Sequence, residues 1–109
     1  DIDDVNQDLY QDVAKLSPFG VGNEKPMFLF RNVKPSTVRK FGKSNDHVEI
    51  VLSKTNGSPL KAISFFGAKS VWAESLVAGK RFDLVASVEK SMFGNRPEIR
   101  LRIEDVIYS

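Results

Sequence analysis

"MFLFRNVKPSTVRKFG", residues 27–42, is a long run of β-prone residues that Asn32 and Pro35 interrupt. Proline has no backbone N–H to donate to a strand ladder, so within a sheet it stands at edges and bulges. We therefore expect one long first strand with a bulge or an edge position near residues 34–36. A strand that bends in this way can belong to both sheets of a small barrel, so the run favours a barrel.

The chain after this run alternates in the way that half-buried strands do. In "HVEIVLS", Val48, Ile50 and Leu52 share one face. Asn56-Gly57 is a strong hairpin signal and joins this strand to the next one. The elements expected after the first strand are strands at 47–53, 60–66, 81–90 and 97–106 and one short helix at 68–80.

The order of these elements indicates the fold class. Five strands with one short helix between the third and the fourth is the order of the OB-fold, a small, partly open Greek-key barrel. An SH3-like barrel and a two-layer α+β sheet are the competing architectures, and the long interrupted first strand favours the OB-fold. Residues 27–109 are therefore expected to form an all-β, five-stranded OB-fold domain. We expect Trp72, in the helix, to close the bottom of the barrel.

The N-terminal segment has a different pattern, because its apolar residues recur at helical spacing. They are Ile2, Val5, Leu9, Val13 and Leu16. Asp3 or Asp4 is expected to cap the start of this helix, and Ser17-Pro18 to end it. We expect residues 1–17 to be the tail of an upstream domain, with the apolar face buried on that domain, on the barrel or on both. The chain does not begin with Met, and we expect it to be a piece of a longer protein.

The composition restricts the possible functions. The chain has 109 residues, no cysteine and a formal net charge of +2. The absence of cysteine excludes disulfides, zinc–thiolate sites and thiol nucleophiles, and it fits a reducing compartment. Residues 1–30 hold six acids and two bases, whereas residues 31–109 hold fourteen bases and eight acids. A positive domain favours polyanionic partners, although such a surface also serves simply to keep a domain soluble.

No catalytic pattern stands out in the sequence. Asp46-His47 is a metal-binding type of pair, but a two-metal site needs several convergent carboxylates or imidazoles, and this chain has one His. No serine stands in a G-x-S-x-G elbow. Gly20 and Gly22 follow a predicted helix and precede a predicted strand, which is the wrong context for a dinucleotide phosphate loop. We expect no catalytic residue and no metal site in this chain.

Basic residues interleaved with aromatic residues are typical of an OB-fold that binds single strands. Such domains bind through the second and third strands and through two loops, here at residues 41–46 and 91–96. The residues expected to contact nucleic acid are Arg39, Lys40, Phe41, Lys43, Lys54, Lys61, Phe65, Phe93, Arg96, Arg100 and Arg102. The aromatic members are stacking candidates, although Phe41 and Phe93 could equally seal the barrel ends. Alternation predicts that one of Phe65 and Phe66 points inward and the other outward.

"LSPFGVGNEKPMF", residues 16–28, resembles the L-x-P-F-G-x-G-N-x-x-P-x-F motif of the RecJ-type single-stranded-DNA exonucleases of the DHH family. In that family the motif joins the catalytic core to a C-terminal OB domain. The similarity continues through a G-x-x-x-x-H pattern that ends at His47. The residues at motif positions of this connector, expected at 18–26, are Pro18, Phe19, Gly20, Gly22, Asn23 and Pro26.

The resemblance implies that the parent protein digests single-stranded DNA in the 5′ to 3′ direction in the cytoplasm. It also implies Mn²⁺ or Mg²⁺, held by Asp and His residues of N-terminal domains with a D-H-H motif. No stretch of this sequence matches that motif, so we expect the chain to bind single-stranded DNA, mainly by electrostatic attraction, for an active site located elsewhere. Expected partners are single-stranded DNA, the parent's own catalytic core and a single-strand-binding protein.

Two other functions are compatible with the same residues. The alternative is a docking module that positions the catalytic core or a single-strand-binding protein, with the basic face against an acidic protein surface. An independent nuclease would degrade DNA with Mn²⁺ alone, and we expect no such activity from this chain.

Overall fold

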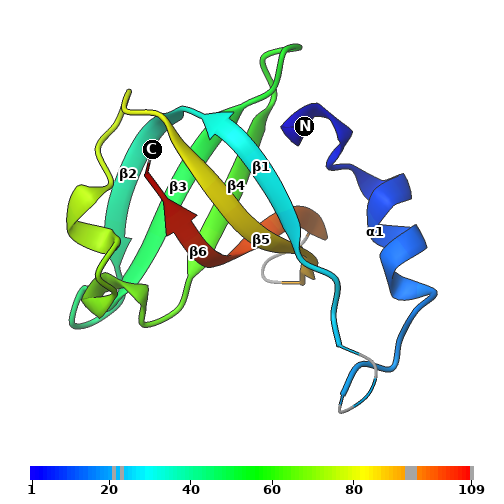
Figure 1. Ribbon diagram of the computed structural model, residues 1–109. Coiled ribbons are helices and arrows are strands. Elements are labelled where there is room, and N and C mark those ends of the chain that lie inside the picture. Colours follow the sequence, from blue (N-terminus) through cyan, green and yellow to red (C-terminus); the bar gives the residue numbers. More distant parts are fainter. Residues whose placement is uncertain (21, 23, 93–95, 109) are drawn as a thin grey trace.

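The computed structural model describes residues 1–20, 22, 24–92 and 96–108, and Figure 1 shows their arrangement. The strands are β1 (Phe28–Val33), β2 (Pro35–Phe41), β3 (His47–Ser53), β4 (Pro59–Ser64), β5 (Phe82–Ser91) and β6 (Glu98–Ile107). The N-terminal segment contains a 3-10 helix, η1 (Ile2–Asp4), and the helix α1 (Gln7–Ala14). Two further 3-10 helices, η2 (Gly67–Lys69) and η3 (Ala73–Ser75), lie between β4 and β5.

The strands form one sheet in the order β1-β5-β6-β4-β3-β2, and the two outermost strands, β1 and β2, follow each other in the chain. The sheet therefore closes on itself into a barrel (Figure 1). The described strand pairs are antiparallel except β4 and β6, which pair in parallel at Ala62–Leu101 and Ile63–Arg102. This topology is that of the Greek-key OB-fold barrel, so the predicted all-β OB-fold class is confirmed.

The strand count differs from the predicted five because the first strand is divided at Lys34. The pairing of β2 with β3 shifts register between Pro35 and Thr37, which is the irregularity predicted near residues 34–36. The pairing of β1 with β5 also shifts register just before the break. One stretch of chain thus serves both ends of the sheet, and it bends where proline removes a backbone donor.

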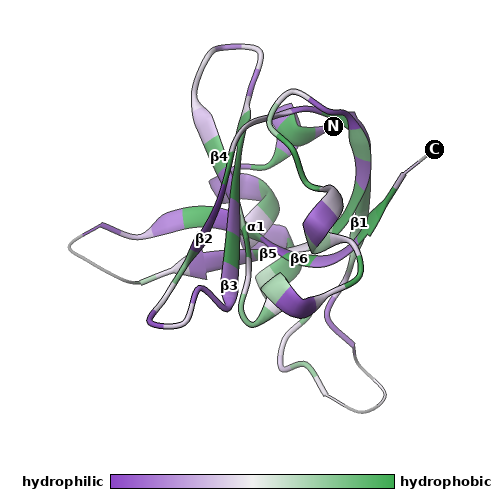
Figure 2. Ribbon diagram, turned by 90° about the vertical axis from the view of Figure 1, so that its left-hand side faces the viewer, coloured by the Kyte–Doolittle hydropathy of each residue, from purple (hydrophilic) through white to green (hydrophobic). Residues whose placement is uncertain are grey.

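Alternation along the strands places the apolar side chains inside the barrel, as predicted. The largest fully buried side chains include Ile50, Leu52, Leu84 and Leu101, each less than 2% exposed. Figure 2 shows hydrophobic and hydrophilic stretches alternating along the strands. Burying an aliphatic side chain of this size contributes about 1.5–3 kcal/mol relative to leaving it exposed. The barrel therefore has an apolar core that stabilises it without disulfides.

The segment after β4 does not form the single helix predicted at residues 68–80. It forms η2 and η3 instead, and neither has a side-chain hydrogen bond at its N-cap. A helix of this length is marginal on its own in water. The path of the chain is set here by burial of Trp72, Ala73 and Leu76 in the core. Trp72 is 9% exposed, in agreement with its predicted position against the barrel interior.

The N-terminal segment also differs in detail from the predicted single helix. The chain is extended at Val5, between η1 and α1. The cap of α1 is Asn6, whose side-chain oxygen accepts a backbone N–H of the first turn at 2.9 Å, rather than Asp3 or Asp4. Asp3 accepts the backbone N–H and the hydroxyl of Thr55 in the β3–β4 hairpin. These hydrogen bonds hold the pKa of Asp3 below its usual range.

Val5 joins the N-terminal segment to the core. Its side chain is 1% exposed, and the Lys54 ammonium group donates a hydrogen bond to its carbonyl oxygen. Val13 is also buried, whereas Leu16 is 54% exposed. The apolar face of the segment is thus buried in part against the barrel of the same chain. Its continuation into an upstream domain stays a prediction.

Candidate nucleic-acid interface

A groove of about 520 Å³ crosses the outer face of the barrel over β2, β3, β4 and β6. Strand pairing aligns Arg39, Glu49, Ile63 and Arg102 in one row across these four strands. The groove is lined by Arg39, Phe41, Glu49, Lys61, Ile63, Phe65, Ser91, Glu98 and Arg100. Five of these residues belong to the predicted binding set, so the fold gathers a large part of that set in one place.

Four side chains form an aromatic cluster where β2 ends, β3 begins and β4 ends. We use this name for Phe41, His47, Phe65 and Phe66. The His47 ring is at its centre, with its centroid 4.8–5.2 Å from those of the three phenylalanines. The contacts of His47 with Phe65 and Phe66 are edge-on, at interplanar angles of 76° and 78°. Ring quadrupoles favour this geometry over face-to-face stacking.

The backbone is shaped around the His47 ring at two positions. Gly42 has φ +93°, and a Cβ atom there would lie 2.7 Å from His47 Cδ2, so glycine is needed to leave room for the ring. Phe66 donates its backbone N–H to His47 Nδ1 at 2.9 Å. Because Nδ1 accepts, a neutral imidazole carries its proton on Nε2. The G-x-x-x-x-H pattern from Gly42 to His47 therefore has a steric cause.

Phe65 and Phe66 are both exposed, at 39% and 71%, so the prediction that alternation sends one of them inward is wrong. The strand β4 ends at Ser64, and Phe66 has φ 62°, so strand alternation no longer applies there. Gly67 permits the close return of the chain, because a Cβ atom there would lie 2.2 Å from Ser64 Oγ. Phe66 was absent from the predicted binding set, and only its position between an aromatic residue and a glycine could have indicated it.

Arginines cover the phenylalanine rings of the groove. The Arg39 guanidinium lies 5.0 Å from the Phe41 ring centroid, and those of Arg102 and Arg100 lie 4.6 Å and 5.7 Å from that of Phe65. Such cation–π contacts contribute about 0.5–1 kcal/mol at exposed sites. Phe41 thus lines the groove, whereas Phe93 lies outside the described residues.

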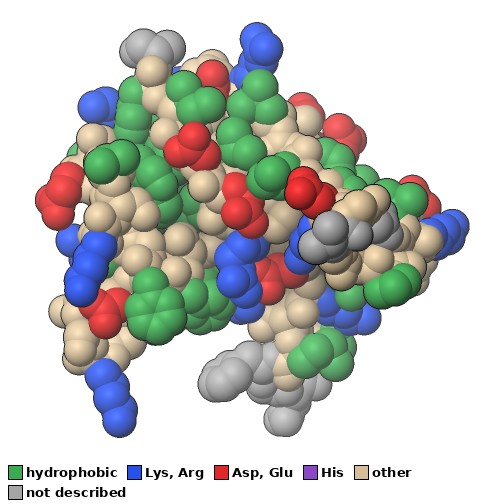
Figure 3. All heavy atoms as spheres, turned by 60° about the horizontal axis from the view of Figure 1, so that its bottom comes forward, with side chains coloured by type: hydrophobic (Ala, Val, Ile, Leu, Met, Phe, Trp, Pro, Cys, Tyr) green, Lys and Arg blue, Asp and Glu red, His purple; other side chains and the backbone are tan. Residues whose placement is uncertain are grey.

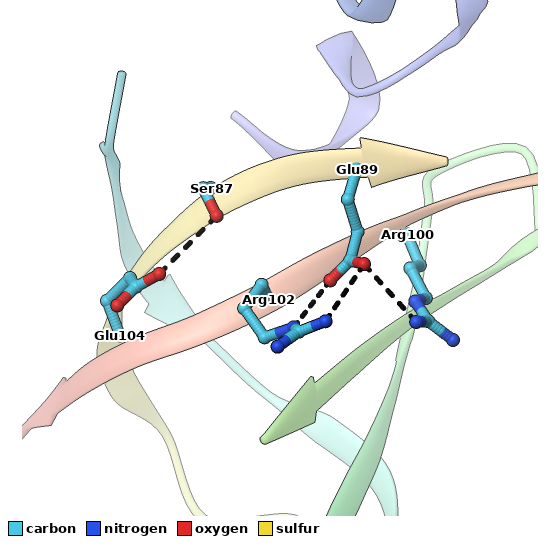
Figure 4. A network of polar contacts seen from close by, with 5 residues as sticks. All are labelled: Ser87, Glu89, Arg100, Arg102 and Glu104. Atoms are coloured by element: carbon cyan, nitrogen blue, oxygen red, sulfur yellow. Dashed lines mark hydrogen bonds and ion pairs between the residues drawn. The ribbon is translucent and has the colours of Figure 1, made fainter. Parts of the chain in front are cut away.

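Glu89 on β5 holds the two arginines of β6 (Figure 4). It accepts Arg102 Nε at 2.6 Å and one further nitrogen of Arg102 and one of Arg100 at 3.2 Å. The side chains of Glu89 and Arg100 are 15% and 16% exposed, and that of Arg102 is 37% exposed. Burial raises the pKa of Glu89, but the hydrogen bonds and charges of Arg102 and Arg100 outweigh it, so the pKa lies below its usual range.

Three of the six other cations of the predicted set are also paired with carboxylates. The pairs are Arg39–Glu49 at 2.9 Å, Lys40–Glu74 at 3.8 Å and Lys61–Glu98 at 3.9 Å. On the side of the molecule that Figure 3 shows, Lys and Arg side chains are scattered among acidic and apolar ones, with no continuous basic patch. The three ion pairs balance the charges of these cations within the protein.

Three predicted cations lie outside this pattern. Lys54 is not part of the groove, because its ammonium group holds the N-terminal segment through the Val5 carbonyl. Lys43 lies in the β2–β3 loop, between Phe41 and His47 of the aromatic cluster, and Arg96 precedes β6. Both are exposed, and within the described part of the chain neither forms an ion pair. They are the members of the predicted set that remain available to a phosphate.

The acidic partners of the arginines, Glu49 and Glu89, were not predicted. Glu49 is opposite Arg39 in the pairing of β2 with β3, and Glu89 is opposite Arg100 in the pairing of β5 with β6. Cross-strand pairs of opposite charge are favourable, but they become visible only once the register is known. The sequence contains the signal in a weak form, as glutamates at outward-facing strand positions.

The connector predicted at 18–26 lies between α1 and β1, and none of its described residues lines the groove. Phe19 is half-buried and lines a cavity of about 300 Å³ between α1 and β5. Gly22 has φ +84°, a backbone conformation that glycine adopts without strain. Asn23 lies outside the described residues. The remaining motif residues are Pro18 and Gly20, which are exposed, and Pro26, which is half-buried.

The described residues contain no group of three or more His, Cys, Asp or Glu side chains placed to hold a metal ion. The Mn²⁺ or Mg²⁺ that the family resemblance implies therefore has no fitting ligand set in this part of the chain. Among the same residues, no helix is long and apolar enough to cross a membrane.

The barrel and the groove across β3 and β4 define an OB-fold domain. Members of this class bind oligonucleotides or oligosaccharides on this face. The sequence model described as "RecJ OB domain" matches residues 1–105, which include α1 and the connector. The chain therefore belongs to the RecJ OB domain family. It is 30% identical over 108 residues to the "Single-stranded-DNA-specific exonuclease RecJ" of Bacillus subtilis (strain 168). The match covers 99% of this chain and 13% of that protein.

Solved structures with a similar fold support the architecture. The SSB domain of a Synechococcus protein aligns with a TM-score of 0.53 at 11% identity, over 75% of this chain and 93% of that one. Rim1, a mitochondrial single-stranded DNA binding protein of S. cerevisiae, aligns with a TM-score of 0.54 at 12% identity, over 76% and 93%. At these identities the likeness establishes the OB-fold alone.

Proposed function

We propose that this chain is the single-stranded-DNA-binding OB domain of a RecJ-type 5′ to 3′ exonuclease. The cytoplasmic location of the parent enzyme and its DHH catalytic domains, with Mn²⁺ or Mg²⁺, are part of the same proposal. The observation that carries it is the aromatic cluster beside an arginine-lined groove on the ligand-binding face of the fold. Membership of the RecJ OB domain family supports it.

The groove favours bases over phosphates as its main ligand groups. Phe41 and Phe65 present rings that arginines support from one side, and a base stacked on an aromatic side chain contributes about 1–3 kcal/mol. The arginines themselves are bound to Glu49 and Glu89. We therefore propose that bases lie against the rings while the phosphates follow the rim.

This arrangement revises the mainly electrostatic binding expected from the sequence. Each phosphate contact of a single strand adds roughly −0.7 to the slope of log K against log salt. Lys43 and Arg96, the cations of the predicted set that remain available to a phosphate, therefore lead to a shallow slope of about −1.4. Stacking, which salt does not screen, supplies the remainder of the affinity.

Fluorescence anisotropy with a labelled oligothymidylate at low and moderate salt tests the proposal. We expect binding that weakens modestly as salt rises, and a Lys43→Glu/Arg96→Glu variant that weakens binding mainly at low salt. Lys25→Glu/Lys34→Glu is the matched control, because it makes the same charge change at exposed residues outside the groove, the aromatic cluster and η2. Absence of binding at low salt contradicts the proposal, and we expect no DNA degradation by this chain with Mn²⁺.

Docking on the parent's catalytic core is a second candidate function, favoured by a separate surface. Leu29 on β1 and Ile107 on β6 are both 46% exposed. They share one outer face, because Leu29 is opposite Val85 and Ile107 is opposite Asp83 on β5. A Leu29→Asp variant should weaken association with a separately expressed catalytic core while leaving oligonucleotide binding unchanged. Unchanged association contradicts this second function.

A further inference from the structure

Phe66 combines two unfavourable features that the fold does not require. Its large apolar side chain is 71% exposed, and its backbone is left-handed, with φ 62° and ψ 14°. Among the described residues, the other non-glycine positions with positive φ are Asn32 and Asn45, and asparagine tolerates this conformation well. A bulky residue there is an outlier, and such strain gathers at functional sites.

The strained conformation of Phe66 is held by His47. The Phe66 N–H donates to His47 Nδ1 at 2.9 Å, and the two rings meet edge-on with centroids 4.8 Å apart. His47 itself occupies space that Gly42 leaves open. Two distant parts of the chain, the β2–β3 loop and the end of β4, therefore cooperate to present the Phe66 ring to solvent.

Phe66 lies beside the groove but contributes little to the core. It does not belong to the core cluster or to the partly buried residues packed against it. Through His47 it is continuous with Phe41 and Phe65, whose rings lie 5.1 Å and 5.2 Å from the imidazole. The row of rings thus extends past the end of the groove toward η2.

We propose that Phe66 is a stacking platform for one nucleobase of a bound single strand and that His47 is its positioning residue. This inference rests on the proposed function and deepens it, because it adds a base site beyond Phe41 and Phe65. A nucleobase is the occupant that fits: it is flat, it stacks on an exposed ring, and its neighbours in the strand reach the adjacent rings. A rigid ring loses little conformational entropy when a base binds.

Substitutions at Phe66 separate stacking from folding. Phe66→Ala and Phe66→Gly should both weaken binding of a labelled oligothymidylate by about tenfold, the loss expected for one stacked base. Glycine adopts positive φ without strain, so Phe66→Gly should keep the melting temperature of the unsubstituted chain. Phe66→Trp keeps a stacking surface and should retain binding. Val71→Ala, at a side chain that is 98% exposed and does not line the groove, is the control.

Substitutions at His47 test the positioning role. His47→Phe keeps a ring and removes the acceptor for the Phe66 N–H, whereas His47→Asn keeps an acceptor near the Nδ1 position. We expect weaker binding for His47→Phe and partial rescue for His47→Asn. Combining His47→Phe with Phe66→Ala should cost little beyond Phe66→Ala alone, because both changes remove the same platform. Losses that simply add overturn the positioning role of His47.

The outcomes distinguish this inference from the function on which it rests. If the unsubstituted chain does not bind the oligonucleotide, the proposed function fails. If the unsubstituted chain binds and Phe66→Ala or Phe66→Gly binds equally well, the DNA-binding function stands and the Phe66 platform is wrong. Equal DNA binding together with weaker binding to a catalytic core would assign Phe66 to a protein contact instead.

Discussion

At its first residue, β3 carries His47 among three phenylalanine rings, whereas just beyond its last residue Lys54 and Thr55 bind the N-terminal segment. Polar contacts shape the chain at both ends. At the second end they accompany a fully buried aliphatic side chain, that of Val5. At the first end they leave aromatic rings exposed. Similar contacts thus serve stability at one end of β3 and the presentation of a surface at the other.

The Glu89 network should give the largest effect, because it belongs to both the fold and the groove. Glu89→Gln leaves Arg100 and Arg102 without a counter-charge, and breaking a largely buried ion pair costs about 3 kcal/mol. We expect a fall of that size in the free energy of unfolding, measured with urea, and weaker oligonucleotide binding as Phe65 loses its arginine support. Glu104→Gln, at an exposed residue of β6, is the control. Equal stability of the two variants contradicts the network's role.

The same carboxylate gives a pH dependence with a definite sign. Its pKa in the folded protein is lowered from an ordinary value of 4.5, so its stabilising contribution is fully present above that pH. The contribution is lost as the pH falls through the lowered pKa. The stability difference between the unsubstituted chain and Glu89→Gln should therefore be constant near neutrality and shrink in acid. Asp3, with its own lowered pKa, adds a loss of the same sign to both proteins, and this loss cancels in the difference between them.

Val5→Ala should affect stability and spare binding. The substitution opens a cavity in the core where the N-terminal segment is attached, at a cost of about 2 kcal/mol. Binding of the oligonucleotide, measured where both proteins are folded, should be unchanged. Leu16→Ala, at a side chain that is 54% exposed, should change neither property by much. Weaker binding by Val5→Ala would show that the two ends of β3 are coupled.

Two glycine variants, Gly42→Ala and Gly79→Ala, should differ in stability and affinity by the smallest amount of the effects predicted here. Gly42 and Gly79 have similar positive φ values, +93° and +87°, but only Gly42 faces His47. Alanine at either position costs about 1 kcal/mol of backbone strain. Gly42→Ala should cost about 1 kcal/mol more and weaken oligonucleotide binding, since the His47 ring must move. Identical melting temperatures and affinities for the two variants contradict the steric role of Gly42.

Strand alternation was enough to predict the barrel and most of its core. Val48, Ile50 and Leu52 are buried as expected, because a period of two directly reports the inward face. Pro35 indicated the break in the first strand for an equally local reason, the missing N–H. Alternation failed at Phe66, because the strand ends two residues earlier and the left-handed turn depends on a hydrogen bond that Phe66 donates to His47, nineteen positions away.

The candidate site was predictable by residue type and less so by role. Phe41, Phe65 and Arg100 were expected on this face and lie in the groove. Their partners depend on register: the sequence alone does not place Glu89 opposite Arg100. For the same reason the sequence predicts a DNA contact for Lys54, although its ammonium group binds the N-terminal segment. The count of charged residues predicts a polyanionic partner. Only the fold shows which basic side chains remain available to a phosphate.

Base stacking in the groove is tested most directly by comparing the unsubstituted chain with a Phe41→Ala/Phe65→Ala variant. The measurement is fluorescence anisotropy with a labelled oligothymidylate. Both rings are on the outer face, so the variant should keep the circular dichroism spectrum of the folded barrel. We expect the unsubstituted chain to bind and the variant to bind at least about tenfold more weakly, because stacking on these rings supplies most of the affinity. Equal affinity of the two folded proteins would contradict this expectation.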